Sequence, residues 1–212
     1  MTRPGRIIIL NGAPRSGKSS IARAIQDSFE GVWVNLGVDA QNASLPERFR
    51  PGIGLRPGGE MPAIEALVPQ LYAALYDSIA AHSRNGLNVV ADVGHHDSYS
   101  TPLHLLQGCA TRLKGLPVLF VGVRCVIDVI MARRASGGEG QYLAGTKDDP
   151  VPEPVRRWQG EVHKPGIYDL EVDTQQMSAG ACAAKILERL RGGLGRPTAF
   201  ETLAEGRQPH KI

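Results

Sequence analysis

Short, nearly continuous apolar runs alternate with longer amphipathic stretches along this chain of 212 residues. The runs predict strands over residues 7–10, 32–38, 88–93, 117–123 and 170–172. The stretches predict helices over residues 17–29, 63–83, 101–114, 126–135, 155–163 and 179–191. Strands without polar alternation are buried on both faces, as in a parallel sheet that helices cover. The pattern therefore predicts an α/β fold, a three-layer α/β/α sandwich around a five-stranded parallel sheet.

Two segments interrupt the alternation. Residues 42–62 and 136–154 are rich in Gly and Pro and predict irregular connections, the second of them mobile. The second segment lies between two predicted helices, so residues 126–163 are expected to form a helical lid. Hydrophobicity falls after residue 191. The prediction is one domain over residues 1–191, followed by a surface-bound or disordered extension over residues 192–212.

The first predicted strand runs directly into a glycine-rich motif with the pattern G-x-x-x-x-G-K-S. A predicted helix follows it, and this is the context that the phosphate-binding P-loop needs. Glycines let backbone amides surround phosphate oxygens, and the helix adds its positive end. Lys18 is expected to reach the terminal phosphates, and the Ser19 hydroxyl is expected to bind Mg²⁺. The predicted nucleotide contacts are Gly12, Ala13, Pro14, Arg15, Ser16, Gly17, Lys18, Ser19 and Ser20.

Two carboxylates end predicted strands. Ligands of parallel sheets bind at the carboxyl ends of the strands, so both carboxylates should lie beside the P-loop. Asp39 is expected to act as a general base that accepts the proton of an attacking hydroxyl, with a helix N-cap or loop carboxylate as the alternative. Asp92 is expected to help hold Mg²⁺, with a strand-end cap as the alternative.

The segment after Asp92 holds adjacent histidines, His95 and His96. Neighbouring side chains point apart, and neither a Cys nor a third His lies at the spacing of a zinc site. Contact with the substrate, or a plain loop, is therefore favoured over a metal site. The substrate contacts predicted on this basis are Asp39, Asp92, His95 and His96.

Several residues of the second half are expected to contact the nucleotide. Arg124 ends the fourth predicted strand, and Arg133 lies in the lid, where a guanidinium can stabilise a moving phosphoryl charge. A solvated helix face is the equal alternative for Arg133 and Arg134. Asp173 and Thr174 end the last strand beside the P-loop and are expected to border the adenine.

Composition changes this picture little. The net charge is +3, which is too small to favour nucleic acid as a partner. No apolar run has the length of a membrane span, and no signal segment precedes the first strand. A cytoplasmic protein without a membrane partner is therefore expected.

Blocks across the chain resemble one family, the chloramphenicol phosphotransferase-like P-loop kinases. The blocks are residues 7–12 with the P-loop, residues 37–39, residues 121–125 with Arg133, residues 162–163 and residues 168–174. The resemblance implies ATP-dependent phosphorylation of a small-molecule hydroxyl, with ATP and Mg²⁺ as cofactors. It implies that Asp39 is the base, and the chemistry of the residues adds Lys18 and Arg133 as predicted catalytic residues.

Residues 40–62, 91–96 and 136–154 depart from the family pattern, and these segments are expected to shape the acceptor pocket. Chloramphenicol is the first acceptor that the resemblance suggests. The alternatives are a kinase of another nucleoside, a sugar or a nucleic-acid end, and an ATP-binding regulatory protein without phosphotransfer. Whether the chain forms a homo-oligomer is left open.

Overall fold

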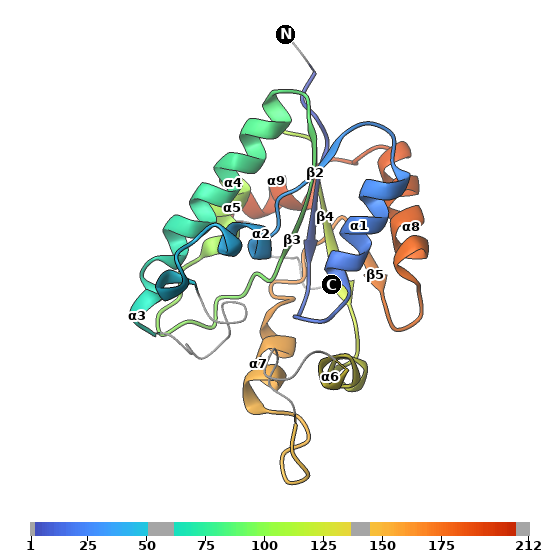
Figure 1. The fold of residues 1–212 in the computed structure, drawn as a ribbon. Coiled ribbons are helices and arrows are strands. Elements are labelled where there is room, and N and C mark those ends of the chain that lie inside the picture. The colour runs from blue at the N-terminus through green and yellow to red at the C-terminus, as the bar shows by residue number, and fades with distance from the viewer. Residues whose placement is uncertain (1–2, 51–61, 137–144, 207–212) are drawn as a thin grey trace.

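The computed structural model describes residues 3–50, 62–136 and 145–206, and a parallel sheet forms the centre of the molecule (Figure 1). The strands are β1 (Ile7–Asn11), β2 (Trp33–Asn35), β3 (Asn88–Val93), β4 (Val118–Arg124) and β5 (Leu170–Asp173). Their order is β2-β3-β1-β4-β5. β1 is central, with Asn11 opposite Val93 of β3 and Gly122 of β4. The predicted α/β/α sandwich with a five-stranded parallel sheet is therefore confirmed.

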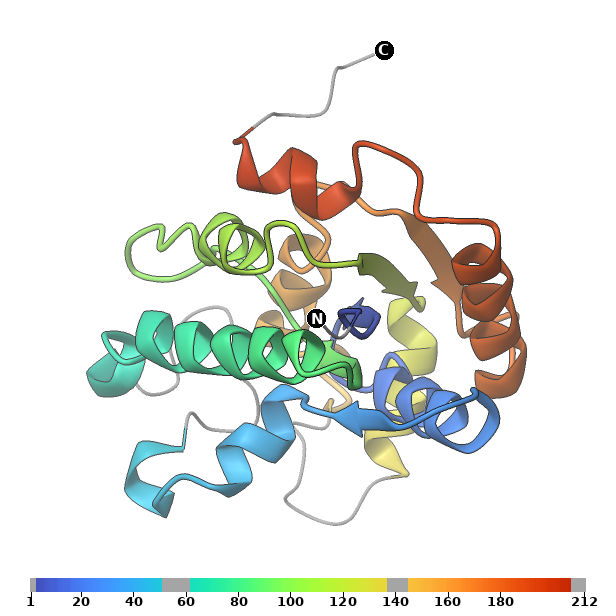
Figure 2. The ribbon, with the colours of Figure 1, turned by 90° about the horizontal axis from the view of Figure 1, so that it is seen from above.

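Successive residues of β1 point to opposite faces of the sheet. Ile7 and Ile9 belong to the apolar cluster of α4 (Val68–Arg84), α5 (Leu105–Arg112) and α9 (Ala199–Ala204). Ile8 and Leu10 belong to the cluster of α1 (Lys18–Ser28) and α8 (Ala179–Arg191). Figures 1 and 2 show the sheet between these two helical layers. Burial on both faces is the reason why the strands read as continuous apolar runs.

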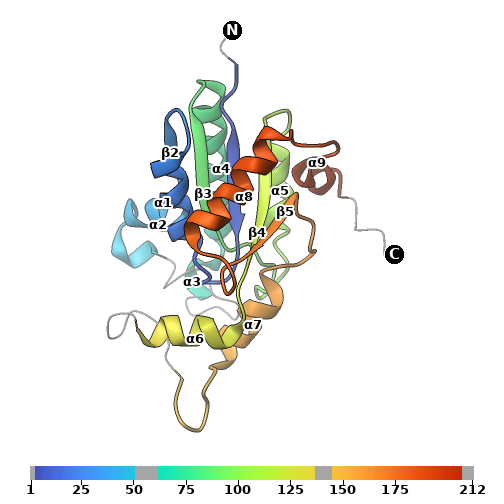
Figure 3. The ribbon, with the colours of Figure 1, turned by 90° about the vertical axis from the view of Figure 1, so that its right-hand side faces the viewer.

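Two further helices lie beyond the carboxyl ends of the strands (Figure 3). These are α6 (Ile127–Ala135) and α7 (Glu153–Glu161), within the segment predicted to be a lid. Their apolar cluster includes Ile130 and Trp158 and extends to Ala13 of the P-loop. Residues 137–144, part of the connection expected to be mobile, lie outside the described residues. Among the described residues, no helix is both long and apolar enough to span a membrane.

Several element boundaries differ from the prediction. The strand expected over residues 32–38 ends at Asn35, and α2 (Val38–Ala43) follows it. The helix expected over residues 63–83 divides into α3 (Pro62–Glu65) and α4. Pro69 lies in the first turn of α4, where its missing N–H removes no helical hydrogen bond.

Of the first irregular segment, the structure describes residues up to 50, including the short 3₁₀ helix η1 (Glu47–Phe49), and residues 51–61 lie outside the description. α5 begins at Leu105 instead of residue 101. The reason is that the Asp97 carboxylate accepts hydrogen bonds from the amides of Leu103 and His104, which keeps this backbone in a turn.

The prediction for residues 192–212 is wrong for α9, which packs into the core. Phe200 is only 3% exposed, and its ring lies 4.9 Å from that of Phe120 on β4. Thr198 and Glu201 form a capping box at the start of the helix. Three buried apolar residues in a polar surrounding were too few to raise the average hydrophobicity of this segment. Residues 207–212 lie outside the described part of the chain.

Phe200→Ala is expected to lower the free energy of unfolding by about 3 kcal/mol, because it leaves a cavity in a close-packed core. Urea denaturation followed by circular dichroism measures this change. Val32→Ala removes methyl groups at a position that is 63% exposed and serves as the control. It should change the free energy by only about 0.5 kcal/mol. Equal effects of the two substitutions would mean that α9 is not part of the core.

Candidate active site

The loop of residues 12–19 has the backbone shape of a phosphate-binding cradle. Arg15 and Gly17 have positive φ angles of 68° and 97°. A Cβ atom added to Gly12 would lie 2.5 Å from a carbonyl oxygen of β4, so only glycine fits there. Among the described residues the buried Ser16 hydroxyl has no hydrogen-bond partner. α1 begins without a side-chain cap, which leaves its first amides available to an anion.

Lys18 is the first residue of α1, and its side chain reaches back to the start of this loop. Its Nζ donates to the carbonyl oxygens of Gly12 and Ala13, each at 2.9 Å. Burial lowers the pKa of Lys18, and the charges of Asp92 and Asp39 oppose that shift. The lysine therefore lies within electrostatic reach of both carboxylates that were expected at this edge of the sheet.

Ser19 and Asp92, the predicted Mg²⁺ ligands, are in direct contact. Ser19 Oγ donates to Asp92 Oδ2 at 2.7 Å. Gly37 leaves room for this carboxylate, because a Cβ atom there would lie 1.7 Å from Asp92 Oδ1. Hydroxyl and carboxylate oxygens are ligands that suit Mg²⁺. Within the described ranges no three His, Cys, Asp or Glu residues gather around one point, so this pair would need oxygens from phosphate and water.

Asp39 lies in the first turn of α2 and not at the end of a strand, so the predicted placement is wrong. The chain leaves β2 early, where the Gly37 amide donates to Asn35 Oδ1 at 3.2 Å. Gly37 is the N-cap of α2, so Asp39 is not a cap. Desolvation and the Asp92 carboxylate raise the pKa of Asp39, and Lys18 opposes them. Asp39 therefore lies within electrostatic reach of Lys18 and Asp92, as expected, but it belongs to a helix and not to the end of a strand.

Arg133 joins the P-loop to the end of β5. Its Nη1 donates to the carbonyl oxygen of Arg15 at 3.2 Å and to Thr174 Oγ1 at 3.1 Å, and its Nη2 donates to the Thr174 carbonyl at 2.8 Å. Thr174 Oγ1 in turn donates to the Ser16 carbonyl at 2.7 Å. Of the two neighbouring lid arginines, Arg133 contacts the loop in this way, whereas Arg134 is buried on another side of α6.

A pocket of about 450 Å³ opens beside this contact, between the P-loop and the start of α8. Its walls include Arg15, Ser20, Arg133, Thr174, Met177 and Ser178. Asp173 directly precedes Thr174 and accepts a hydrogen bond from the Gln175 amide at 2.9 Å. The pocket lies where the sequence predicts the adenine.

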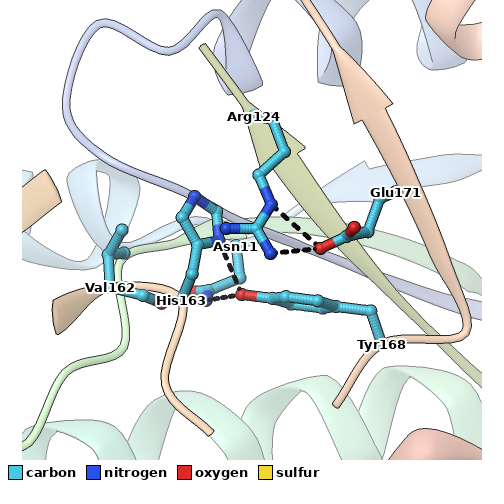
Figure 4. Close-up of polar contacts among 6 residues, drawn as sticks. All are labelled: Asn11, Arg124, Val162, His163, Tyr168 and Glu171. Atoms are coloured by element: carbon cyan, nitrogen blue, oxygen red, sulfur yellow. Dashed lines mark hydrogen bonds and ion pairs between the residues drawn. The ribbon is translucent and has the colours of Figure 1, made fainter. Parts of the chain in front are cut away.

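Arg124 is not brought to this pocket. Val123 packs beneath α1 and α8, so its neighbour Arg124 points to the opposite face of the sheet. There its Nε donates to Glu171 Oε1 at 2.9 Å, and its guanidinium lies 5.8 Å from the centre of the Tyr168 ring (Figure 4). The Arg124 side chain thus forms an ion pair across β4 and β5, and its contact with the nucleotide stays a prediction.

His95 and His96 are both buried in aromatic contacts. His95 Nε2 lies 2.7 Å from Tyr76 Oη, and its ring centre lies 4.7 Å from that of Tyr72. Burial lowers the pKa of His95 to about 3, so the ring is neutral at physiological pH. The His96 ring lies 5.3 Å from Trp158 of α7. We call Tyr72, His95, His96 and Trp158 the aromatic row; it consists of two ring pairs, Tyr72 with His95 and His96 with Trp158, which the adjacent histidines connect along the chain.

The aromatic row borders the P-loop and a second pocket. A Cβ atom at Gly94 would lie 3.1 Å from the Trp158 ring and 3.5 Å from the Gly12 carbonyl, so ring and loop are close there. A pocket of about 540 Å³ lies on the other side, with His95 and His96 in its wall. Of the predicted acceptor residues, His95 and His96 therefore lie in the wall of this pocket, whereas Asp92 contacts Ser19 of the P-loop.

The chain matches the model of one protein family, described as chloramphenicol phosphotransferase-like protein, over residues 5–191. The chain belongs to this family. A Mycobacterium tuberculosis protein with the name "Putative O-phosphotransferase" is 26% identical over 215 residues, which cover 94% of this chain and 88% of the relative. Family and relative together support a phosphotransferase.

Solved kinase structures share the fold. An unliganded sugar kinase from Janibacter sp. HTCC2649 has a TM-score of 0.61 at 16% identity, over 95% of this chain and 99% of that chain. The Mycobacterium tuberculosis APS kinase CysC, solved with AMPPNP and APS, has a TM-score of 0.59 at 15% identity, over 89% and 98% of the two chains. At these identities the likeness shows the fold alone, and the fold is that of P-loop kinases.

Several contributors to the site have no role predicted from the sequence, although Gly37 and Asn11 lie in the blocks that resemble the family. Gly37 is one of 25 glycines, and its role is to leave space for Asp92, which comes from β3. Asn11 ends β1 and contacts the lid through its buried amide. Trp158 did carry a signal, since a lone large aromatic residue in a charged segment indicates a buried contact.

Asp39→Asn is expected to stabilise the protein at pH 7 by up to about 1 kcal/mol, since Asp39 is partly exposed and screened. The folded pKa of Asp39 lies above its unfolded value, so the charged form costs stability at any pH above both values. The gain should shrink as the pH falls through the raised pKa and vanish below the unfolded value. Thermal unfolding of both proteins between pH 3 and pH 7 measures it.

Asp27→Asn is the matched control, because Asp27 is exposed on α1. It should leave the unfolding temperature nearly unchanged at every pH. A fall in stability of Asp39→Asn at pH 7 would show that this carboxylate has a stabilising partner and would contradict the electrostatic description.

Proposed function

We propose that this protein transfers the γ-phosphoryl group of ATP to a hydroxyl group of a small molecule. The observation that carries the proposal is the arrangement of Lys18 on the P-loop carbonyls with Asp39 and Asp92 in electrostatic reach. A cation for phosphate and a carboxylate with a raised pKa are what transfer to an alcohol needs, since positioning and electrostatics supply most of the catalysis.

ATP is proposed to bind with its phosphates in the loop of residues 12–20. The positive φ angles, the unpartnered Ser16 hydroxyl and the uncapped start of α1 support an anion there. The pocket of about 450 Å³ beside Thr174 has room for the adenine. Arg133 and Thr174 fix the relative position of loop and pocket, and Asp173 borders them.

Mg²⁺ is proposed to be held by Ser19 and, directly or through water, by Asp92. The contact of 2.7 Å between their oxygens, with Gly37 leaving the space, supports this ligand pair. When bound, Mg²⁺ neutralises charge on the phosphate oxygens.

Asp39 is the proposed general base. Its carboxylate accepts the proton of the acceptor hydroxyl as the hydroxyl oxygen bonds to the γ-phosphorus and the bond to the β–γ bridging oxygen breaks. Lys18 stays with the phosphates and balances their charge. Arg133 keeps its positive charge beside the loop while it holds the loop in shape.

The acceptor is proposed to lie over the aromatic row, between Asp39 and the lid. Tyr72 packs near α2, and Trp158 belongs to α7, so the row spans the two elements that would flank an acceptor. Its rings favour an acceptor with an apolar or aromatic part beside the reacting hydroxyl. His95 and His96 are buried and support the outer rings from within. Chloramphenicol is the first compound to test.

A panel of hydroxylated compounds with ATP and Mg²⁺ tests the proposal by mass spectrometry of phosphate adducts. Chloramphenicol, aminoglycosides, sugars, nucleosides and single-stranded oligonucleotides belong in the panel. A small-molecule adduct is expected. Phosphate on an oligonucleotide end would instead favour a nucleic-acid kinase, and binding of ATP without any product would favour a regulatory protein.

Asp39→Asn is expected to reduce kcat for the identified acceptor by about 10² to 10⁴, because the general base is lost. Its affinity for a non-hydrolysable ATP analogue, measured by calorimetry, should stay within a few-fold of wild type. Asp27→Asn should transfer at the wild-type rate. Transfer by Asp39→Asn at an undiminished rate would show that another group accepts the proton.

Arg133→Ala is expected to weaken binding of the same analogue about tenfold, which corresponds to about 1.4 kcal/mol, because three hydrogen bonds to loop and β5 are lost. Arg157→Ala removes an exposed ion pair with Glu153 on α7 and should leave binding unchanged. If both variants bind equally, Arg133 has no part in shaping the nucleotide site.

A further inference from the structure

Asn11 joins three segments at the carboxyl end of β1, and Figure 4 shows it beside two of them, at Val162 and Tyr168. Its Oδ1 accepts from the His95 amide at 2.7 Å. Its Nδ2 donates to the Val162 carbonyl at 2.7 Å and to Tyr168 Oη at 2.8 Å. The residue is 1% exposed, so each of these groups would lose its partner in a buried place if the amide were removed.

Chemistry fixes the roles of Asn11 in this chain of hydrogen bonds, and from them we infer the tautomer of His163. A carbonyl can only accept and an amide N–H can only donate, so Nδ2 of Asn11 must face Val162. Nδ2 therefore also donates to Tyr168 Oη, and the hydroxyl proton of Tyr168 is left to donate to His163 Nδ1, at 2.9 Å. With Nδ1 as acceptor, the ring proton of neutral His163 lies on Nε2.

Tyr168 is itself held in place by packing. Its ring centre lies 4.8 Å from that of Phe120. A Cβ atom at Gly122 would come within 2.9 Å of the ring, so the ring lies directly on the β4 backbone. The hydroxyl that orients His163 therefore has a fixed position.

His163 lies close to the phosphate-binding lysine. Val162 contacts Asn11, whose neighbour Gly12 contacts Lys18 Nζ. Burial, Arg124 and Lys18 lower the pKa of His163 to about 4, so the ring is neutral at physiological pH. The effect of Arg124 and Lys18 on this pKa means that His163 lies within electrostatic reach of both side chains. Glu171 holds the guanidinium of Arg124. Among the described residues, Nε2 of the half-buried His163 has no protein partner.

We propose that His163 Nε2–H donates a hydrogen bond to an oxygen of the γ-phosphoryl group during transfer, with Tyr168 and Asn11 as positioning residues. The inference rests on the proposed phosphotransfer. A donor aimed at developing phosphoryl charge stabilises it without reorganisation, and a neutral donor does so without repelling Lys18. No proton leaves His163 in this step.

Nitrogen-15 NMR of the histidine rings tests the proposal without an acceptor. Wild type is expected to show His163 as the Nε2–H tautomer, and its Nε2 signal should shift on addition of a non-hydrolysable ATP analogue with Mg²⁺ but not of ADP with Mg²⁺. Tyr168→Phe keeps the ring packing and should yield a mixture of tautomers. A Nδ1–H tautomer in wild type, or equal responses to the two nucleotides, would overturn the proposal.

Kinetics give a second test. His163→Leu should reduce kcat about 10²-fold, whereas His163→Gln, which keeps a neutral N–H donor, should stay within about tenfold of wild type. His82→Leu is the control, because His82 lies in the last turn of α4. This variant should transfer phosphate with the kcat of wild type. Equal losses in the Leu and Gln variants would indicate a structural role only. If wild type phosphorylates no acceptor, the proposed function fails, while the NMR result still decides the role of His163.

Discussion

The positive charge of Lys18, held in a desolvated loop, is the constraint on which the rest of the site depends. A buried ammonium is stable only with acceptors and opposite charge nearby. Two loop carbonyls and the carboxylates of Asp39 and Asp92 supply them. The two acids come from different elements, and Gly37 serves both: it leaves space for Asp92 and begins the helix of Asp39. Gly37 therefore helps to place both carboxylates that face Lys18.

The lid contacts the P-loop from two sides. On one side Trp158 packs near Gly94 and Ala13, and on the other Arg133 bonds to the loop and to Thr174. Neither contact is a surface ion pair, so salt screens them little. The P-loop and the lid helices consequently form one hydrogen-bonded and packed unit. The loop is proposed to bind phosphate, and the helices are proposed to cover it.

The sequence predicts those parts of the fold and site that depend on residues close together in the chain. The P-loop is a contiguous motif between a strand and a helix, and the strands are continuous apolar runs, so both were predictable. The contact of Ser19 with Asp92 follows from strand ends that meet at one edge. The helical position of Asp39 and the burial of α9 depend on partners far away in sequence, so the predicted strand end at Asp39 and the predicted surface-bound or disordered extension were wrong. The ion pair of Arg124 also depends on a distant partner, and the contact of Arg124 with the nucleotide stays a prediction.

The position of α9 has a consequence for the order in which the molecule is completed during synthesis. Phe200 contacts Phe120, Phe120 contacts Tyr168, and the Ala199 amide donates to Asp169 next to Tyr168. The P-loop of residues 12–19 leaves the ribosome before these packing partners, because synthesis runs from the amino end of the chain. The ring beneath His163 therefore gains its full support only after residues 199 and 200 have been synthesised. A nascent chain has its P-loop sequence long before it can build a complete site around it.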